Sequence, residues 1–170
     1  MSRPLLAETV AEAARRFGDR AAFQLADGTE LSYRELDRAS DEVAAGLAGR
    51  GLGPGNVLLL SLPSSLEYAV GYLAAAKVGV TTAGANPRLR ARERALIIEA
   101  VDPDLILAND ALSDGIPEDR RVELVGDGND PTQLLAGLRG HGEVVPAVPA
   151  DPYRPTCICF TSGTMPTMGL

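Results

Sequence analysis

The sequence predicts an α/β fold in which helices flank a parallel, doubly wound sheet, with a small N-terminal β-hairpin. Two observations support this prediction. Short apolar runs of strand length alternate along the chain with longer segments of helical periodicity, and strands that alternate with helices form parallel sheets joined by crossover helices. The clearest run, residues 57–60 (VLLL), is apolar without alternation, as expected of a strand covered on both faces.

A helix and a hairpin are predicted first. Between residues 5 and 17, apolar side chains spaced four, three and four residues apart form one helix face. They are Leu6, Val10, Ala13 and Phe17. Asp27-Gly28 then separates residues 22–25 from residues 30–33. Such a dipeptide between two strand-like segments indicates a β-hairpin turn.

Two capping boxes predict the next two helices. Ser32 with Glu35 opens a helix that ends near Arg50, and Ser64 with Glu67 opens one that ends near residue 78. The first of these helices has a stripe of apolar residues at helical spacing that we expect to be buried. The stripe consists of Leu36, Ala39, Val43 and Leu47.

The remainder of the chain continues the alternation of strands and helices. Strands are predicted at residues 80–83, 105–108, 122–125 and 156–161, and helices at residues 90–101 and 133–138. Residues 140–155 are rich in Gly and Pro and are interpreted as a loose connector.

Two motifs that contain glycine are interpreted as turns. Gly51-Leu52-Gly53-Pro54-Gly55 follows a predicted helix and precedes a predicted strand. A dinucleotide-binding fingerprint has the reverse order, so the motif is a helix C-cap and turn. Asp127-Gly128-Asn129-Asp130 lacks the spacing and the closing Glu of a calcium-binding loop.

Composition and charge narrow the classes of function. At 170 residues with a net charge of −7, the chain is predicted to be one domain, or one lobe of a larger one, that does not bind nucleic acid. Neither a secretory signal nor an apolar run of 18 residues is present, so we expect no membrane span and a cytoplasmic protein. Several charged residues are expected to be mostly solvated on helix faces. They are Arg88, Arg90, Arg92 and Arg94, and Glu8, Glu12, Glu35, Asp37, Asp41 and Glu42.

The sequence offers no catalytic or metal-binding group of side chains. Cys157 and Cys159 alternate along an apolar run and are predicted to be buried, reduced thiols. Two cysteines alone do not make a structural zinc site. The one histidine, His141, lies in a polar, glycine-rich stretch, and no Ser/His/Asp arrangement follows from it.

One segment has the residue types of a phosphate-binding loop. Phe160 is followed by Thr161, Ser162, Gly163 and Thr164. A glycine lets the backbone approach an anion, and neighbouring hydroxyls donate to phosphate oxygens. The segment follows a predicted strand, and in parallel sheets ligands bind beyond the carboxyl ends of the strands. Small hydroxyl residues around a glycine also form ordinary turns, so the segment alone leaves both interpretations open.

An ordered set of motifs resembles the N-terminal part of the adenylate-forming superfamily, which contains acyl-CoA synthetases, adenylation domains and luciferases. The resemblance covers roughly residues 5–164, and within the superfamily the chain looks most like fatty or aryl acyl-CoA synthetases. The motifs are residues 31–36, residues 43–57 (with Asn56 where the family has Asp), residues 62–67, residues 73–79, Asn86-Pro87 and residues 160–164.

The resemblance implies an N-terminal lobe with an ATP-dependent reaction. Relatives use MgATP to adenylate a carboxylate, and a thiol, usually CoA, then displaces AMP. Thr161, Ser162, Gly163 and Thr164 would bind the β- and γ-phosphates. The family's loop continues through a second glycine to a lysine, whereas this chain continues Met165-Pro166-Thr167-Met168-Gly169-Leu170. We therefore expect residues 1–170 to be a single lobe truncated within the phosphate loop, inactive alone and without bound cofactor.

Two other functions remain open at this stage. The first alternative is a stand-alone, non-catalytic interaction or dimerisation module. The second is a regulatory protein that binds a nucleotide or CoA. Because a lobe of this kind packs against a second lobe in its relatives, self-association or packing against such a lobe is expected.

Overall fold

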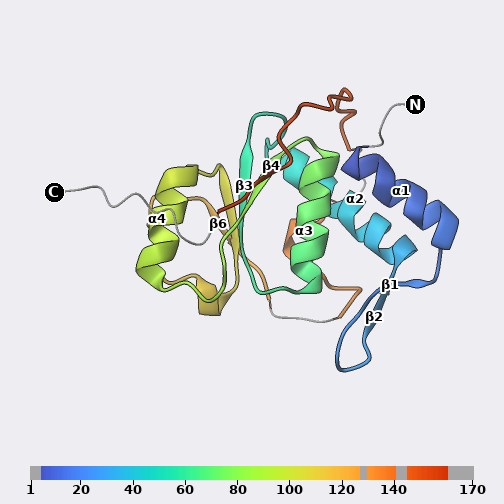
Figure 1. The fold of residues 1–170 in the computed structure, drawn as a ribbon, viewed down its shortest axis with the longest axis horizontal. Helices are drawn as coiled ribbons and strands as arrows, with labels where there is room; N and C mark the ends of the chain where they lie inside the picture. Colours follow the sequence, from blue (N-terminus) through green and yellow to red (C-terminus); the bar gives the residue numbers. More distant parts are fainter. Residues whose placement is uncertain (1–4, 127–129, 141–144, 161–170) are drawn as a thin grey trace.

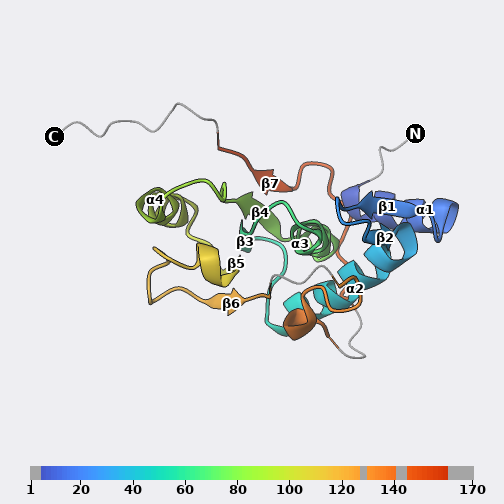
Figure 2. The same ribbon diagram turned by 90° about the horizontal axis from the view of Figure 1, so that it is seen from below.

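A five-stranded parallel sheet lies at the centre of the molecule, between helices on its two faces (Figures 1 and 2). The computed structural model describes residues 5–126, 130–140 and 145–160. The strand order is β6-β5-β3-β4-β7, and each neighbouring pair is parallel. The strands are β3 (Val57–Ser61), β4 (Thr81–Gly84), β5 (Leu105–Ala108), β6 (Val122–Leu124) and β7 (Cys157–Ile158).

Helices cover both faces of the sheet, which confirms the doubly wound prediction. One face packs with α2 (Tyr33–Gly49) and α3 (Leu66–Lys77) in a core that includes Leu58 and Leu60. The opposite face packs with α4 (Ala91–Val101) through Leu59 and Ile98. Since successive side chains of a strand point to opposite faces, the unbroken apolar run of β3 supplies both cores.

The N-terminal elements also match the prediction. Helix α1 (Leu6–Phe17) precedes an antiparallel hairpin of β1 (Ala21–Gln24) and β2 (Glu30–Ser32). At the start of α2, the Ser32 hydroxyl accepts from the Glu35 amide, and a Glu35 carboxylate oxygen lies 2.9 Å from the Ser32 amide nitrogen that donates to it. The predicted capping box is therefore present, and the stripe that it introduces is buried.

Some boundaries differ from the prediction. Helix α3 is capped by Ser65, which accepts from the Tyr68 amide, so the predicted capping box of Ser64 with Glu67 is wrong. Glu67 instead lies in the buried first turn of α3. The helix expected over residues 133–138 is a 3-10 turn, η2 (Ala136–Leu138), and the described part of residues 140–155 contains no helix or strand.

The expectation that charges on helix faces are mostly solvated is wrong for Arg94 and for the partly buried Asp37, whereas Asp41 is exposed although it is paired. Arg94 is buried in α4 while Arg88, Arg90 and Arg92 are exposed. Asp37 and Asp41 on α2 each lie 2.6 Å from the ammonium group of Lys77 on α3. The periodicity of a helix contains no information about the side chains of neighbouring elements. It therefore predicted neither the burial of Arg94 nor the ion pairs of Lys77 with Asp37 and Asp41.

Candidate functional site

The carboxyl ends of the parallel strands form the edge where a ligand site is expected in this class of fold. Three described loops follow β3, β4 and β5 at this edge, and β7 enters it beside β4. The loops cover residues 62–65, 85–90 and 109–116. The first two are short, whereas residues 109–116 are the first part of a longer connection to β6 and contain the 3-10 turn η1 (Asp110–Leu112).

Hydrogen bonds connect these loops to each other. The Ser61 hydroxyl donates to the Leu112 carbonyl oxygen at 3.2 Å, which joins the end of β3 to the loop after β5. The Arg94 guanidinium donates to the Leu89 carbonyl oxygen before α4 and to the Asp114 carbonyl oxygen, the latter at 2.9 Å. The buried Arg94 therefore holds the β4–α4 loop against the loop that follows β5.

Gly115 completes this connection by close backbone contact. Its φ is +82°, and an added Cβ would lie 2.5 Å from the Ala91 carbonyl oxygen. A residue with a side chain would be strained by the backbone conformation and would also clash with the first turn of α4. At the carboxyl edge of the sheet, the backbone of the loop after β5 therefore packs directly against the first turn of α4.

Cys157 lies on β7, an outer strand of the sheet, and Cys159 follows directly after that strand. Both are exposed, which corrects the prediction that they are buried. β7 pairs only with β4 among the described strands. The sulfur atoms of the two cysteines lie 3.6 Å apart, within hydrogen-bonding distance. The apolar run predicted burial, but the position of β7 in the sheet is set by its pairing with the distant strand β4.

Local interactions raise the pKa values of Cys159, Tyr68 and Tyr72. The hydrogen bond to Cys157 is the main cause that raises the pKa of the Cys159 thiol above its ordinary value. Burial is the main cause that raises the pKa of the Tyr68 and Tyr72 hydroxyls. All of these groups are therefore kept in their protonated forms at neutral pH.

The predicted phosphate-loop residues Thr161, Ser162, Gly163 and Thr164 lie outside the described residues, as do His141 and residues 127–129. The last described residue, Phe160, follows β7 and is 45% exposed. Because β7 runs parallel to β4, the chain reaches Phe160 at the carboxyl edge of the sheet. The strand predicted over residues 156–161 is thus confirmed at Cys157 and Ile158, and its last residue is outside the described part.

A set of metal ligands is not assembled at this edge by the part of the chain that the structure describes. Among these residues, no three or more His, Cys, Asp or Glu side chains come together in a group that could hold a metal ion. The described residues therefore do not fit a bound Mg²⁺, and no chemical step is assigned to one here.

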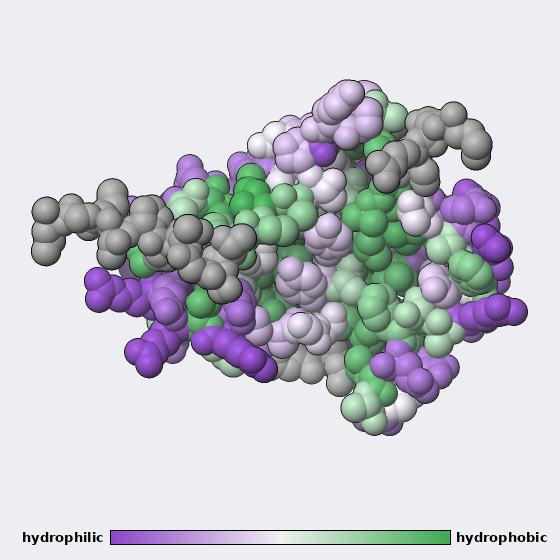
Figure 3. Space-filling view, in the orientation of Figure 1, coloured by the Kyte–Doolittle hydropathy of each residue, from purple (hydrophilic) through white to green (hydrophobic). Residues whose placement is uncertain are grey.

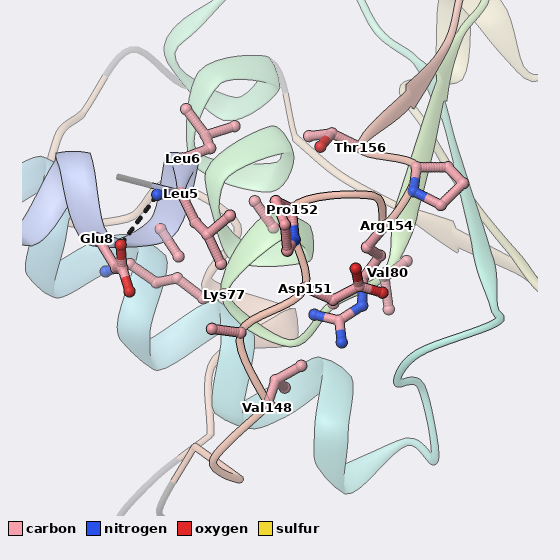
Figure 4. A pocket seen from close by; sticks show the side chains of 15 residues that line it. Leu5, Leu6, Glu8, Lys77, Val80, Val148, Asp151, Pro152, Arg154 and Thr156 are labelled. Atoms are coloured by element: carbon pink, nitrogen blue, oxygen red, sulfur yellow. Dashed lines mark hydrogen bonds between the residues drawn. The ribbon is translucent and has the colours of Figure 1, made fainter. Parts of the chain in front are cut away.

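A cavity of about 160 Å³ lies at the opposite, amino edge of the sheet (Figure 4). Its walls come from the start of α1, the end of α3 and residues 148–156, which precede β7. Figure 4 shows Leu5, Val148 and Pro152 beside the charged side chains of Lys77 and Arg154. No sequence signal predicts this cavity, since the connector that lines it has no periodicity and the other segments of its wall are distant in sequence.

Comparison with known proteins decides the family. The model of the AMP-binding enzyme family matches residues 10–165, which include every strand of the sheet. The chain belongs to the AMP-binding enzyme family. The adenylate-forming resemblance carried by the ordered motifs is thereby confirmed.

Relatives of this AMP-binding chain include ligases of aromatic acids. The chain is 32% identical over 143 residues to 4-coumarate--CoA ligase 5 of Oryza sativa subsp. japonica, covering 82% of this chain and 26% of that protein. It is 31% identical over 175 residues to the salicyl-AMP ligase / salicyl-S-ArCP synthetase of Mycobacterium tuberculosis, covering 91% of this chain and 30% of that protein. The chain thus spans less than a third of these two relatives.

Solved structures agree with the fold. Apo MbtA of Mycobacterium smegmatis superposes with a TM-score of 0.77 at 28% identity, covering 96% of this chain and 32% of that one. The N-terminal domain of FACL13 from Mycobacterium tuberculosis gives a TM-score of 0.79 at 20% identity, covering 94% and 42%. The predicted fold of an N-terminal lobe is confirmed. In the described residues, every helix is too short or too polar to cross a bilayer.

Proposed function

We propose that this chain is the part of an ATP-dependent, carboxylate-adenylating ligase that carries the first residues of the phosphate loop. The observation that supports the proposal most strongly is the family match combined with the position of β7. The match runs through residue 165, and β7 leads the chain to the carboxyl edge of the sheet immediately before Thr161. Ligands in parallel α/β sheets bind at that edge.

In this proposal, the backbone amides and hydroxyls of residues 161–164 donate to the β- and γ-phosphate oxygens of ATP. Donors aimed at the phosphates stabilise the charge that develops on departing pyrophosphate. The three connected loops lie at the same carboxyl edge to which β7 leads. Mg²⁺ would accompany the ATP, and its protein ligands would lie outside the described residues.

The acid is proposed to be an aryl or fatty carboxylate, with CoA as the thiol acceptor. The printed names of the 4-coumarate and salicyl relatives support the aryl class. Peptide synthetases are also among the relatives, including a dimodular nonribosomal peptide synthase of Bacillus subtilis at 31% identity. The experiment therefore includes amino acids as well.

The experiment is carboxylate-dependent ATP–pyrophosphate exchange with panels of fatty, aryl and amino acids. We expect no exchange above a control without enzyme. Residues 165–170 contain no lysine, and the loss of even one preorganised oxyanion donor lowers rates by about 100-fold or more. Exchange that Ser162→Ala or Thr164→Ala abolishes would contradict the proposed inactivity while supporting the site. Exchange that neither variant affects would contradict the site.

A second function, as an interaction module, is favoured by exposed apolar surface. Figure 3 shows apolar residues at the surface in the region of α3. Phe160 after β7 and Leu124 at the end of β6 are 45% and 61% exposed, respectively. Apolar surface at both edges of the sheet would favour packing against a second lobe or a second copy.

A further inference from the structure

We propose that the cavity at the amino edge of the sheet binds a small, uncharged aromatic molecule with a single ring. The cavity has a volume of about 160 Å³. An engineered protein cavity of about 150 Å³ with apolar walls binds benzene, so a ring of this size fits. The cavity lies at the edge opposite the one to which β7 leads, and the inference does not depend on the proposed function.

Most of the cavity wall is apolar (Figure 4). Apolar side chains come from the start of α1, from the residues that join α3 to β4 and from the connector before β7. They include Leu5, Leu6, Val80, Val148 and Pro152. A ring bound among these side chains removes apolar surface from water on both the ligand and the protein, which is favourable.

Two carboxylates of the described chain line the cavity, and each already accepts a hydrogen bond. A Glu8 carboxylate oxygen accepts from the Leu5 amide at 2.9 Å. An Asp151 carboxylate oxygen accepts from the Tyr153 amide, also at 2.9 Å. Two cations line the same wall, so its formal charges balance and do not select a charged ligand.

The two cations favour an aromatic ring. An ammonium group has three N–H donors, and those of Lys77 go to the Asp37 carbonyl oxygen and to carboxylate oxygens of Asp37 and Asp41. The apolar stem of Lys77 is therefore the part that remains for a ligand. Arg154 donates to the Pro149 carbonyl oxygen. A planar guanidinium also attracts the face of an aromatic ring, an interaction that an aliphatic ring cannot make.

The connector is fixed against the sheet, so the cavity is formed before a ligand binds. An added Cβ at Gly79 would lie 3.0 Å from a methyl group of Val148, which shows how closely the connector approaches the start of β4. The Thr81 hydroxyl donates to the Pro155 carbonyl oxygen at 3.1 Å. A bound ring would join α1, α3 and the connector, and would thereby restrain the residues that lead into β7.

The experiment is an amide NMR titration of the isotope-labelled chain with phenol at about pH 7, where a phenol is uncharged. We expect saturable shifts in residues 76–80 and 148–156, with a Kd of about 1 mM. Cyclohexanol, the aliphatic comparator, should bind at least about twofold more weakly because it lacks the interaction with the guanidinium. Benzoate should also bind more weakly than phenol, because its carboxylate finds no free counter-ion.

Two variants that fill the cavity test its assignment. Ala76→Leu on α3 and Ala150→Leu on the connector both place a larger side chain in the volume that the ring needs. Each should weaken phenol binding by at least about tenfold while the chain stays folded, because packed interiors tolerate little added volume. Ala100→Leu on the exposed face of α4 is the matched control and should leave the affinity unchanged. Tm values confirm that each variant is folded.

Three results would overturn the inference. The first is phenol shifts that do not saturate or that do not centre on residues 76–80 and 148–156. The second is wild-type affinity in both folded filling variants. The third is cyclohexanol or benzoate binding as tightly as phenol, which would overturn the assignment to an uncharged aromatic ring.

Discussion

Ser32 and Glu35 exchange hydrogen bonds at the start of α2, and these bonds lower the pKa of the Glu35 carboxyl. A carboxylate with a lowered folded-state pKa stabilises the fold fully above its unfolded-state pKa of about 4.3. This stabilisation is lost as pH falls through the lower folded-state pKa. Glu35→Gln should therefore reduce the free energy of unfolding at pH 7, and the difference from wild type should shrink below about pH 4. Urea unfolding at several pH values measures this, and a difference independent of pH would refute the assignment.

Gly46 provides a second test at the scale of one residue. A Cβ at this position of α2 would lie 1.6 Å from the Leu138 carbonyl oxygen. Gly46→Ala should lower the free energy of unfolding by about 1–3 kcal/mol or more, because backbone must move. Gly71→Ala in α3 is the matched control, since its nearest contact would be an ordinary 3.5 Å. The control should be neutral or stabilising by up to about 1 kcal/mol through helix propensity. Equal urea midpoints for the two variants would contradict this account.

Among the elements, the junction of the β4–α4 loop with the loop after β5 depends on Arg94. Arg94→Met removes the bonds to the Leu89 and Asp114 carbonyl oxygens, at a cost of about 1–3 kcal/mol for hydrogen bonds of a charged group. We expect faster amide hydrogen exchange in residues 109–116, with little change in β3. Arg92→Met on the exposed face of α4 should change stability by less than about 0.5 kcal/mol. Unchanged exchange in residues 109–116 would show that Arg94 does not hold the junction.

Local sequence signals predicted most elements, because periodicity and capping act within a few residues. The apolar run of β3 and the Ser32–Glu35 box were confirmed on this basis. Contacts between elements were not predictable in this way. The exposure of Cys157 depends on β7 being the outer strand, and the burial of Arg94 depends on carbonyl groups that lie up to 20 residues away. The amino-edge cavity is likewise formed by segments that meet only in the folded chain.

For the whole molecule, exposed apolar surface predicts association that grows with concentration. Phe160 lies beside the outer strand β7 and is 45% exposed. Phe160→Ser should weaken self-association in sedimentation velocity, because the apolar area available for burial decreases. Phe23→Ser in the hairpin is the matched control, at 41% exposure in the wild type. A wild-type chain that remains monomeric at high concentration would contradict the prediction.

We propose that the segment after β7 is the start of an ATP phosphate loop, and that residues 1–170 by themselves bind ATP only weakly. The most direct test is a titration of the isotope-labelled chain with MgATP, followed by amide NMR shifts. We expect weak binding, with a Kd of about 1 mM or above, and shifts concentrated in residues 159–164. Thr164→Ala should reduce those shifts. Micromolar binding, or shifts that cluster at residues 148–156 around the amino-edge cavity instead, would contradict the account.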